Sequence, residues 1–502
     1  MRAERVATIK KALIAGYPII GINTYEEEQA VGALALFSRS VYGSDRPLLT
    51  WDLSHGLTSG ETIVDPAPTP EAALDCIVAH TEPAFFVCRD LVTFLDRPAI
   101  QRRLRDIGSA FRGTNRFLFL LGADIFPPPA LAKDIHLVDF LLPDTVELRE
   151  IIEKAVAAAV KKGAENRLTA DQMTQAAVTL KGFTGVEAQY SLNKVLWNLK
   201  VIDDSLLMAL SDEKEQMARK SGILEYVRVS SSINEVGGLQ NLKDWLVKRK
   251  KLFSPEAAAA GITPPRGLLM MGISGCGKSL SVKAISHSWN LPLFRLDMNQ
   301  IYSGLYGTPE GAFHRAIKFV EAVAPAILWI DEIEGGISSV AMKDGSTGSH
   351  IFSAFLTWMQ EKSADVFVAA TANRIDLLPA EIIRKGRFDQ VFFIDLPNDK
   401  DREDIFRVHL KRRGNDPAQF DLTLLSVATE YWNGAEIEHV VEAAMVEAFH
   451  RGTPMHQDDL YTIIRGTVPL SRTMSEQIKF IKLWASERAV SASAAPQGDG
   501  RA

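Results

Sequence analysis

The sequence predicts an α/β protein with two tandem copies of one module, each a parallel sheet with helices on both faces that is followed by a small helical lid. Apolar runs of strand length alternate with amphipathic helical stretches along most of the 502 residues, which is typical of parallel sheets. Segments of the first half recur in the same order in the second half. Apolar residues make up 46% and charged residues 24% of the chain, which is the composition of a folded globular protein and not of a disordered one.

The internal repeat consists of four pairs of similar segments. Each pair alone is short enough to match by chance, because apolar strands resemble one another. Four matches in the same order indicate a duplicated module instead. The pairs are residues 83–90 with 325–332, 117–124 with 366–373, 142–151 with 396–405, and 185–187 with 434–436.

Composition also indicates the domain boundaries. Residues 213–232 are polar and predict a linker, and the residues from Ala489 onwards are too small and polar to stay ordered. We therefore expect an α/β domain without a phosphate loop at 1–143, its helical lid at 144–212, the linker at 213–232, an active α/β domain at 233–397, a second lid at 398–470, and a C-terminal helix with a disordered tail at 471–502.

Charge and apolar patterning exclude several function classes. The chain has 56 Lys and Arg against 62 Asp and Glu, a net charge of −6, so no general positive field attracts nucleic acid or anionic lipid. No apolar run reaches the ~20 residues that span a bilayer, and three cysteines are too few for a disulfide framework. We expect a cytoplasmic protein that binds neither a membrane nor nucleic acid.

A phosphate loop is predicted in the second copy only. Residues 272–279 read GISGCGKS and fit the pattern GxxxxGK[ST], with a strand-like run before them and a helical stretch after them. The glycines let backbone N–H groups turn toward phosphates, and the helix N-terminus adds its positive dipole end. Lys278 is expected to reach the β- and γ-phosphates of ATP, and the Ser279 hydroxyl to bind Mg²⁺. The predicted nucleotide-binding residues of this P-loop NTPase core are Gly272, Ser274, Gly275, Cys276, Gly277, Lys278, Ser279 and Leu280.

Cys276 lies inside this loop and has two interpretations. A lowered thiol pKa would make it redox-sensitive. A small residue at a tolerant loop position would have no chemistry of its own. The sequence leaves both open.

Two strand ends supply polar residues for the chemistry. The apolar run at 327–330 leads into Asp331 and Glu332, and the run at 366–372 ends at Asn373. Ligands of open α/β sheets bind at the carboxyl ends of such strands. Asp331 is expected to hold Mg²⁺, Glu332 to deprotonate the attacking water, and Asn373 to contact the γ-phosphate and that water. Two acids at a strand end that simply face solvent are the alternative.

Two arginines follow in the segment 383–389, which reads IRKGRFD. An arginine that meets the developing charge of a phosphoryl transfer raises the rate by roughly 10³–10⁵. Arg384 and Arg387 are therefore candidates for contact with the nucleotide of a neighbouring subunit. A solvated basic turn is the alternative.

Taken together, these residues resemble the AAA ATPases over roughly residues 232–470. The resemblance includes GISGCGKS, WIDEIE, TAN and RKGRFD in family order, with VGGL at 236–239 before them and Gly434–Ala435 after them. The whole chain is similar to a divergent branch first noted as conserved open reading frames of plastid and cyanobacterial genomes.

The resemblance implies a role for each matching residue. Gly237 would lie against the adenine, Asn373 would sense the γ-phosphate, and Gly434–Ala435 would open the lid helix near the nucleotide. Arg384 and Arg387 would act in trans, which implies a homo-oligomeric ring, usually of six subunits. ATP and Mg²⁺ are the cofactors that the family uses.

Two features depart from the family pattern. AAA translocases carry a pore loop of aromatic, hydrophobic and Gly residues, but the LYG at 305–307, with Leu305 first and Tyr306 second, places the aromatic one position later. In the first copy, three acids at 26–28 stand where a phosphate loop would be and repel a triphosphate, and Arg89–Asp90 replace the acid pair. We expect a catalytically inactive first copy that serves ring contacts or partner binding.

The sequence thus predicts an AAA-type ATPase that binds and hydrolyses Mg-ATP and couples hydrolysis to the remodelling or regulation of a protein partner. The alternative is a nucleotide-gated scaffold that turns over slowly and threads no substrate. The sequence specifies neither the partner nor the ring size.

Overall fold

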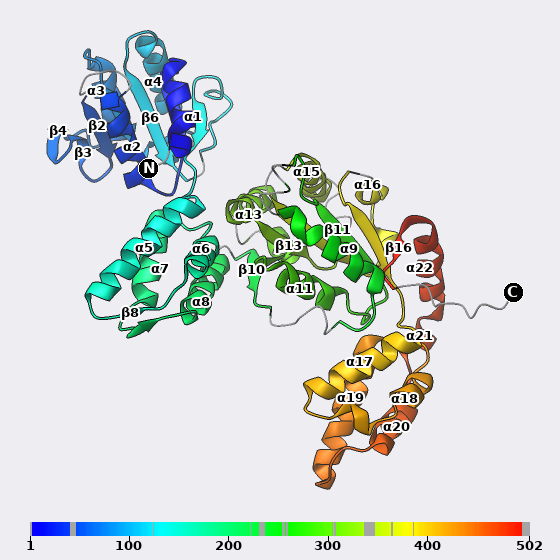
Figure 1. Ribbon diagram of the computed structural model, residues 1–502. Coiled ribbons are helices and arrows are strands. Elements are labelled where there is room, and N and C mark those ends of the chain that lie inside the picture. Colours follow the sequence, from blue (N-terminus) through cyan, green and yellow to red (C-terminus); the bar gives the residue numbers. More distant parts are fainter. Residues whose placement is uncertain are drawn as a thin grey trace. The chain divides into compact units, whose positions relative to one another are not determined.

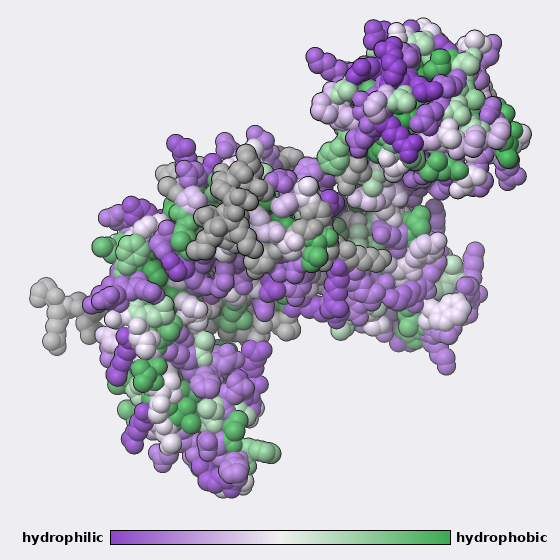
Figure 2. Space-filling model, turned by 180° about the vertical axis from the view of Figure 1, so that it is seen from behind, coloured by the Kyte–Doolittle hydropathy of each residue, from purple (hydrophilic) through white to green (hydrophobic). Residues whose placement is uncertain are grey.

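The computed structural model divides the chain into two units, Met1–Ser211 and Asp212–Ala502. Each unit consists of a sheet with helices and a smaller group of helices that follows it (Figure 1). Hydrophilic side chains cover most of the face seen in Figure 2, and within the described chain no helix combines the length and the apolar character needed to cross a membrane. The described residues are 3–40, 47–123, 125–220, 222–229, 236–253, 257, 260–303, 305, 308–335, 347–362, 365–384 and 386–493.

The sheet of the first unit has seven strands in the order β4-β3-β2-β5-β6-β1-β7. β2, β5, β6, β1 and β7 are parallel, and β3 and β4 form an antiparallel hairpin at one edge. Successive strand residues face opposite sides, so Phe86 belongs to the core on one face and Phe85 to the core on the other. The elements are α1 (Ala3–Ile14), β1 (Ile19–Asn23), α2 (Glu27–Ser40), β2 (Leu48–Asp52), β3 (Gly56–Ser59), β4 (Thr62–Asp65), α3 (Pro70–Ala79), β5 (Phe85–Cys88), the 3₁₀ helix η1 (Leu91–Phe94), α4 (Pro98–Phe111), β6 (Phe117–Gly122) and β7 (His136–Asp139).

The sheet of the second unit also has seven strands, in the order β10-β12-β13-β14-β11-β15-β16. All are parallel except β10, which pairs antiparallel with β12 at one edge. The elements are β10 (Leu224–Val227), α9 (Gln240–Lys250), η3 (Lys251–Phe253), β11 (Gly267–Gly272), α11 (Lys278–Trp289), β12 (Leu293–Leu296), α12 (Met298–Tyr302), α13 (Pro309–Val323), β13 (Ala326–Ile330), α15 (Thr347–Glu361), β14 (Val366–Ala372), η4 (Ile375–Leu377), α16 (Ala380–Ile383), β15 (Gln390–Ile394), α21 (Leu470–Thr473), α22 (Ser475–Arg488) and β16 (Val490–Ser491).

The order of the parallel strands confirms the predicted duplication of an α/β module. β2-β5-β6-β1-β7 in the first unit corresponds to β12-β13-β14-β11-β15 in the second. The pairing corrects one sequence match by a single residue. Cys88 pairs with Leu120, and the corresponding Ile330 pairs with Ala370. Leu120 therefore corresponds to Ala370, whereas the sequence match had aligned it with Ala369, one residue earlier. Apolar strand residues resemble one another, so the strand register and not the residue types fixes this offset.

A helical lid follows each sheet. Corresponding lid helices begin with corresponding caps, because Thr184 and Glu187 form a capping box at α7, and Asn433 and Glu436 form one at α19. The elements of the first lid are α5 (Thr145–Lys161), β8 (Glu165–Asn166), α6 (Ala170–Thr179), α7 (Gly185–Val195), β9 (Val201–Ile202) and the start of α8 (Ser205–Lys220), whose residues from Asp212 onwards belong to the second unit. Those of the second lid are α17 (Asp399–Arg412), η5 (Pro417–Gln419), α18 (Leu422–Ala428), α19 (Gly434–Arg451) and α20 (Gln457–Gly466).

The expected linker at 213–232 is largely regular structure. It contains the end of α8 and all of β10, whose Leu224 pairs with Leu296 of β12. Ala218 and Leu224 are buried at 0% and 3% exposure in the core of the second unit. A few apolar side chains within a polar segment were therefore enough to add a helix end and an edge strand.

The first residues of the expected disordered tail are ordered. Residues 490–491 form β16, which pairs parallel with β15. Ala492 is fully buried, and its N–H donates to the carbonyl of Phe393 at 2.9 Å. Backbone hydrogen bonds hold this segment, so its small and polar side chains gave no signal. Residues 494–502 lie outside the described residues.

Lys362 is a partly buried cation at the amino ends of the strands in the second sheet. Its Nζ donates to the carbonyl oxygens of Arg266, at 2.8 Å, and of Val366. Burial lowers the pKa of Lys362 from its usual 10.5 to about 7, although nearby Asp389 favours the charged form. Above this pH the folded protein therefore releases a proton that the unfolded chain still holds.

We predict that Lys362 makes the free energy of unfolding rise with pH. Below pH ~7 the ammonium is charged in both states, so the folded state bears the full penalty of burying it. Between pH ~7 and ~10 that penalty disappears, because the amine is neutral in the folded state only. Denaturant unfolding at about pH 6 and about pH 9 should show wild type gaining stability relative to Lys362→Met. A difference between the two proteins that does not change with pH would contradict this prediction.

Candidate active site

The phosphate loop connects β11 to α11. Gly277 precedes α11 with φ = 92°, a left-handed conformation that glycine adopts without strain, and the turn directs the N-terminus of α11 toward the loop. Lys278 is buried at 7% exposure, and its Nζ donates to the carbonyl oxygens of Gly272 (3.0 Å) and Ile273 (2.8 Å). Burial lowers its pKa. The loop therefore encloses a cation beside a helix N-terminus, an arrangement suited to phosphate.

Ser279 and Asp331, the predicted Mg²⁺ ligands, lie together. Ser279 is in the first turn of α11, and its Oγ donates to Oδ1 of Asp331, the residue after β13, at 3.3 Å. The hydroxyl of Thr371 in β14 donates to the same oxygen. A hydroxyl and a carboxylate beside a phosphate loop are hard oxygen donors, which Mg²⁺ takes together with phosphate oxygens. The residues present therefore fit this ion.

Glu332 and Asn373 are also brought together. The Asn373 Nδ2 donates to Oε1 of Glu332 at 2.8 Å. The Oδ1 of Asn373 is buried and has no hydrogen-bond partner among the described residues. Glu332 has φ = 47°, an unusual value for a residue with a side chain. A polar acceptor and a carboxylate thus sit side by side at the carboxyl ends of β13 and β14.

Glu334 supports this arrangement and was missed by the sequence analysis. It is buried at 5% exposure, and its Oε1 accepts the backbone N–H groups of Asn373 (2.7 Å) and Arg374 (3.0 Å). These bonds fix the backbone from which the Asn373 side chain projects. A signal was available, because Glu334 is a third acid two positions after Glu332. Only the fold shows its contact with a segment 39 residues away.

The start of the second lid packs against the phosphate loop. The N–H of Ala435 donates to the carbonyl of Gly275 at 3.0 Å. A Cβ at position 275 would lie 2.8 Å from the Asn433 side chain, so only glycine allows this approach. Gly434 is also close to the loop, since a Cβ there would lie 3.2 Å from the Gly275 carbonyl oxygen. A cavity of about 320 Å³ opens here and is lined by Ser274, Gly275, Asn433, Ala435, Glu436, His439, Thr467 and Leu470.

Three further predicted residues have surroundings of different kinds. Gly237 packs on the lid, because a Cβ there would lie 2.7 Å from the side chain of Ile405 in α17. Leu280 packs against the apolar core beneath the loop. Burial raises the pKa of the Cys276 thiol to about 12 and outweighs the effect of the nearby Lys278. The suggestion of a lowered thiol pKa is therefore wrong, and the interpretation of Cys276 as a small loop residue agrees with the structure.

Arg384 and Arg387 lie at the other end of the sheet. Arg384 is exposed after α16, and Arg387 donates to the carbonyl of Glu381 in the same chain. The turn that carries them is fastened to the start of β11, because the Asp389 N–H donates to the Gly267 carbonyl at 2.9 Å. The phosphate loop begins at the opposite end of β11, a distance of about 17 Å at ~3.3 Å per residue. That distance exceeds the length of an arginine side chain.

Of the predicted pore loop at 305–307, the structure describes Leu305 only. This side chain is 77% exposed. Tyr306 and Gly307 lie outside the described residues.

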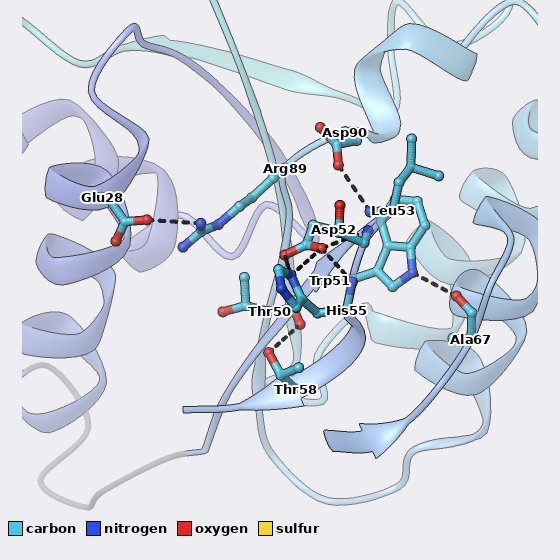
Figure 3. A network of polar contacts seen from close by, with 11 residues as sticks. Glu28, Thr50, Trp51, Asp52, Leu53, His55, Thr58, Ala67, Arg89 and Asp90 are labelled. Carbon is cyan, nitrogen blue, oxygen red and sulfur yellow. Dashed lines mark hydrogen bonds and ion pairs between the residues drawn. The ribbon is translucent and has the colours of Figure 1, made fainter. Parts of the chain in front are cut away.

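The corresponding place in the first unit has the opposite charges (Figure 3). α2 begins with two glutamates, where α11 begins with Lys278 and Ser279. Arg89 follows β5 as Asp331 follows β13, and its Nη1 donates to Oε1 of Glu28 at 2.9 Å. Figure 3 shows the Arg89 side chain pointing toward Glu28. An internal ion pair therefore stands where the second unit has its hydroxyl and carboxylate.

The strand-to-helix turn of the first unit differs as well. Residues 24–26 separate β1 from α2, against residues 273–277 between β11 and α11, so the turn is too short to wrap a phosphate. The carboxylate of Glu26, 4% exposed, accepts the N–H of Gly185 at the start of α7 at 2.6 Å. The first copy is degenerate, as the sequence predicted. Its Glu26 connects the sheet domain of this copy to its lid.

Comparisons with known proteins agree with this division. Residues 6–140 match the family described as SpoVK-like AAA ATPase, N-terminal domain, and residues 268–396 match the ATPase family associated with various cellular activities (AAA). The AAA domain-containing protein ycf46 of Trieres chinensis is 34% identical over 94% of this chain and 95% of its own length. The ycf46 protein of Guillardia theta is 35% identical over 96% and 95%.

More distant relatives match about half of the chain. The proteasome-activating nucleotidase of Thermococcus onnurineus is 29% identical over 55% of this chain and 70% of its own length. The chain therefore belongs to the AAA ATPase family, in the branch of the ycf46 proteins. This finding confirms the resemblance that the motifs indicated.

We predict that the full chain binds one ATP molecule and that this binding requires Lys278. Lys278→Ala should weaken ATP binding by about 30-fold or more, because the phosphate loop loses its buried lysine, the cation that binds the phosphates. Equilibrium titration with a fluorescent ATP analogue measures both affinity and stoichiometry. Lys283→Ala, on the same helix outside the loop, is the matched control and should bind as wild type. Full binding at a second site in Lys278→Ala would contradict the assignment of the first copy as degenerate.

Proposed function

We propose that the second unit binds and hydrolyses Mg-ATP and couples hydrolysis to the remodelling or regulation of a protein partner. The observation that carries this proposal is the assembly of Lys278, the Ser279–Asp331 pair and the Glu332–Asn373 pair around one loop. These residues come from the ends of three different strands. Their side chains supply a phosphate cation, hard oxygen ligands, and a base beside a neutral amide, which are the groups that phosphoryl transfer to water requires.

Each residue has a defined task in this proposal. Lys278 binds the β- and γ-phosphates, and Ser279 and Asp331 hold Mg²⁺. The ion, when bound, offsets the charge that develops on the phosphate oxygens. Glu332 accepts a proton from the attacking water, and the Nδ2 of Asn373 holds the Glu332 carboxylate in place at 2.8 Å. The Oδ1 of Asn373 is buried and has no hydrogen-bond partner among the described residues, so a hydrogen bond from the same water would satisfy it.

Arg384 and Arg387 support an oligomeric mechanism. Both belong to the turn before β15, about 17 Å of strand from the phosphate loop of their own chain. We infer that they complete the site of a neighbouring subunit, in a homo-oligomeric ring that we expect to be a hexamer. AAA proteins commonly form rings and act on protein substrates. Relatives named as a proteasome-activating nucleotidase and as a Cell division cycle protein 48 homolog favour a protein partner for this chain as well.

Contact between loop and lid provides a route for coupling. The hydrogen bond from Ala435 to Gly275 joins α19 directly to the loop that encloses the phosphates. Gly237 lies against α17 of the same lid and is proposed to flank the adenine. Replacement of ATP by ADP would thus change the loop at the point where the lid is attached. A change of lid angle is the motion that a partner would sense.

We predict that Glu332→Gln binds Mg-ATP with wild-type affinity but hydrolyses it about 10²–10⁴-fold more slowly, because only the proton acceptor is lost. Phosphate release and binding of a fluorescent ATP analogue separate the two effects. Glu361→Gln, an exposed acid at the end of α15, is the control. Wild-type turnover by Glu332→Gln would refute the assignment of the base. If wild type itself turned over no faster than the variant while still capturing its partner with ATP, the nucleotide-gated scaffold would be the correct function.

We predict that Arg387→Ala loses hydrolysis by roughly 10³-fold while retaining ATP binding, because the finger acts on another subunit. Mixing Arg387→Ala with Lys278→Ala protein should restore part of the activity, since each variant retains the half-site that the other lacks. Arg407→Ala, an exposed arginine of α17, should hydrolyse ATP as wild type. Turnover that is independent of protein concentration, without rescue on mixing, would indicate a monomeric enzyme.

A further inference from the structure

Thr371 is a buried polar residue in an otherwise apolar strand. All seven residues of β14 are buried, and the other six are Val, Phe and Ala. Thr371 is 1% exposed. A hydroxyl in such a place destabilises the fold unless it is hydrogen-bonded. Valine has the same shape without the hydroxyl and would suit an apolar strand, so packing alone does not explain the hydroxyl.

Both hydrogen-bonding capacities of this hydroxyl are directed at the acid pair. Thr371 Oγ1 donates to Oδ1 of Asp331 and accepts the backbone N–H of Glu332 at 3.1 Å. The register explains the contact, because Ile330 pairs with Ala370 and the next residue on each strand follows directly. One side chain therefore touches the proposed metal ligand and the backbone of the proposed base.

The contact with Asp331 determines how that carboxylate presents its oxygens. Oδ1 accepts from both Thr371 and Ser279. Ser279 is itself a proposed Mg²⁺ ligand, so its hydroxyl turns toward the ion when the ion binds. Thr371 has no such second task and keeps the carboxylate in one orientation. Outer-shell hydrogen bonds of this kind orient ligands and affect metal affinity.

The contact with Glu332 stabilises an uncommon backbone conformation. Glu332 has φ = 47°, in the left-handed region that residues with a side chain seldom adopt. Its N–H is held by Thr371 and its carboxylate by Asn373. Hydrogen bonds therefore hold both the backbone N–H and the side chain of Glu332, and both partners belong to β14 or to the residue that follows it.

The degenerate copy lacks this hydroxyl. Cys88 pairs with Leu120 as Ile330 pairs with Ala370, so Leu121 occupies the place of Thr371. Leu121 is fully buried, and Arg89 occupies the place of Asp331. Where the chain has no acid pair to orient, an apolar residue fills the position.

We propose that Thr371 is a positioning residue of the nucleotide site, whose hydroxyl orients the Asp331 carboxylate toward the divalent ion and holds the turn that directs Glu332. This inference rests on the proposed function for its substrate, Mg-ATP. It requires no contact between Thr371 and the nucleotide.

The test compares Thr371→Val, which has the same shape without the hydroxyl, with Thr371→Ser, which retains it. Mn²⁺ is the probe, and electron paramagnetic resonance measures its affinity in the presence of a non-hydrolysable ATP analogue. Thr371→Val should bind Mn²⁺ about 10-fold or more weakly and show a kcat about 10–100-fold lower. Its affinity for the nucleotide in excess chelator should match that of wild type. Thr371→Ser should restore both metal affinity and kcat.

Two results would overturn the proposal. One is a Thr371→Val protein with wild-type Mn²⁺ affinity and wild-type kcat. The other is a Thr371→Ser protein that loses as much as Thr371→Val, because the methyl group and not the hydroxyl would then matter. Circular dichroism confirms that each variant is folded, and Thr371→Ala replaces Thr371→Val if the latter is not.

The metal measurement separates this proposal from the proposed function. Mn²⁺ affinity is read at equilibrium and needs no hydrolysis. If wild type bound Mn²⁺ and nucleotide without turnover, the proposed ATPase function would fail, while the affinities of the two variants would still decide the role of Thr371. If hydrolysis proceeded with normal metal binding in Thr371→Val, only the present proposal would fail.

Discussion

Parallel pairing of β14 with β11 on one side and with β13 on the other is the interaction on which the site depends. Lys278 belongs to the segment after β11, Asp331 to that after β13, and Asn373 to that after β14, so parallel register brings them to one edge. A slip of one residue would turn the Thr371 side chain to the opposite face of the sheet. The complete burial of β14 opposes such a slip. The apolar packing of β14 thus sets the positions of Lys278, Asp331 and Asn373, which lie outside that strand.

Comparison of the two copies shows that the fold alone does not produce a nucleotide site. Their parallel strands have the same order, and each has a lid helix that begins with a capping box. The charges differ at the strand ends, where Arg89 and Glu28 attract each other at 2.9 Å in one copy, while Ser279 and Asp331 share a hydrogen bond in the other. The first arrangement satisfies its charges internally. The second leaves capacity for a ligand.

The sequence predicted the duplicated α/β fold and the residues that lie together at the phosphate loop, because those residues sit in short motifs beside strands and helices. It missed Glu334 and Thr371, whose partners lie about 40 positions away along the chain and become neighbours only through strand register. It also missed β10, whose few buried apolar residues lie in a polar segment, and β16, whose backbone hydrogen bonds leave no mark on the side-chain pattern. The pKa of Cys276 depended on burial, which local sequence does not reveal.

The edge strands of the second sheet have a consequence for synthesis on the ribosome. β10 lies at one edge and β16 at the other, and residues 491–493 also accept hydrogen bonds from Asn241 and Leu242 of α9. The sheet therefore cannot be complete until residue 492 has left the exit tunnel, whereas every strand of the first sheet is available after residue 139. Domains generally fold in the order of synthesis. The degenerate copy is thus the one that folds early, and in the nucleotide-binding unit the β15 edge has no strand partner while residues 395–489 are being synthesised.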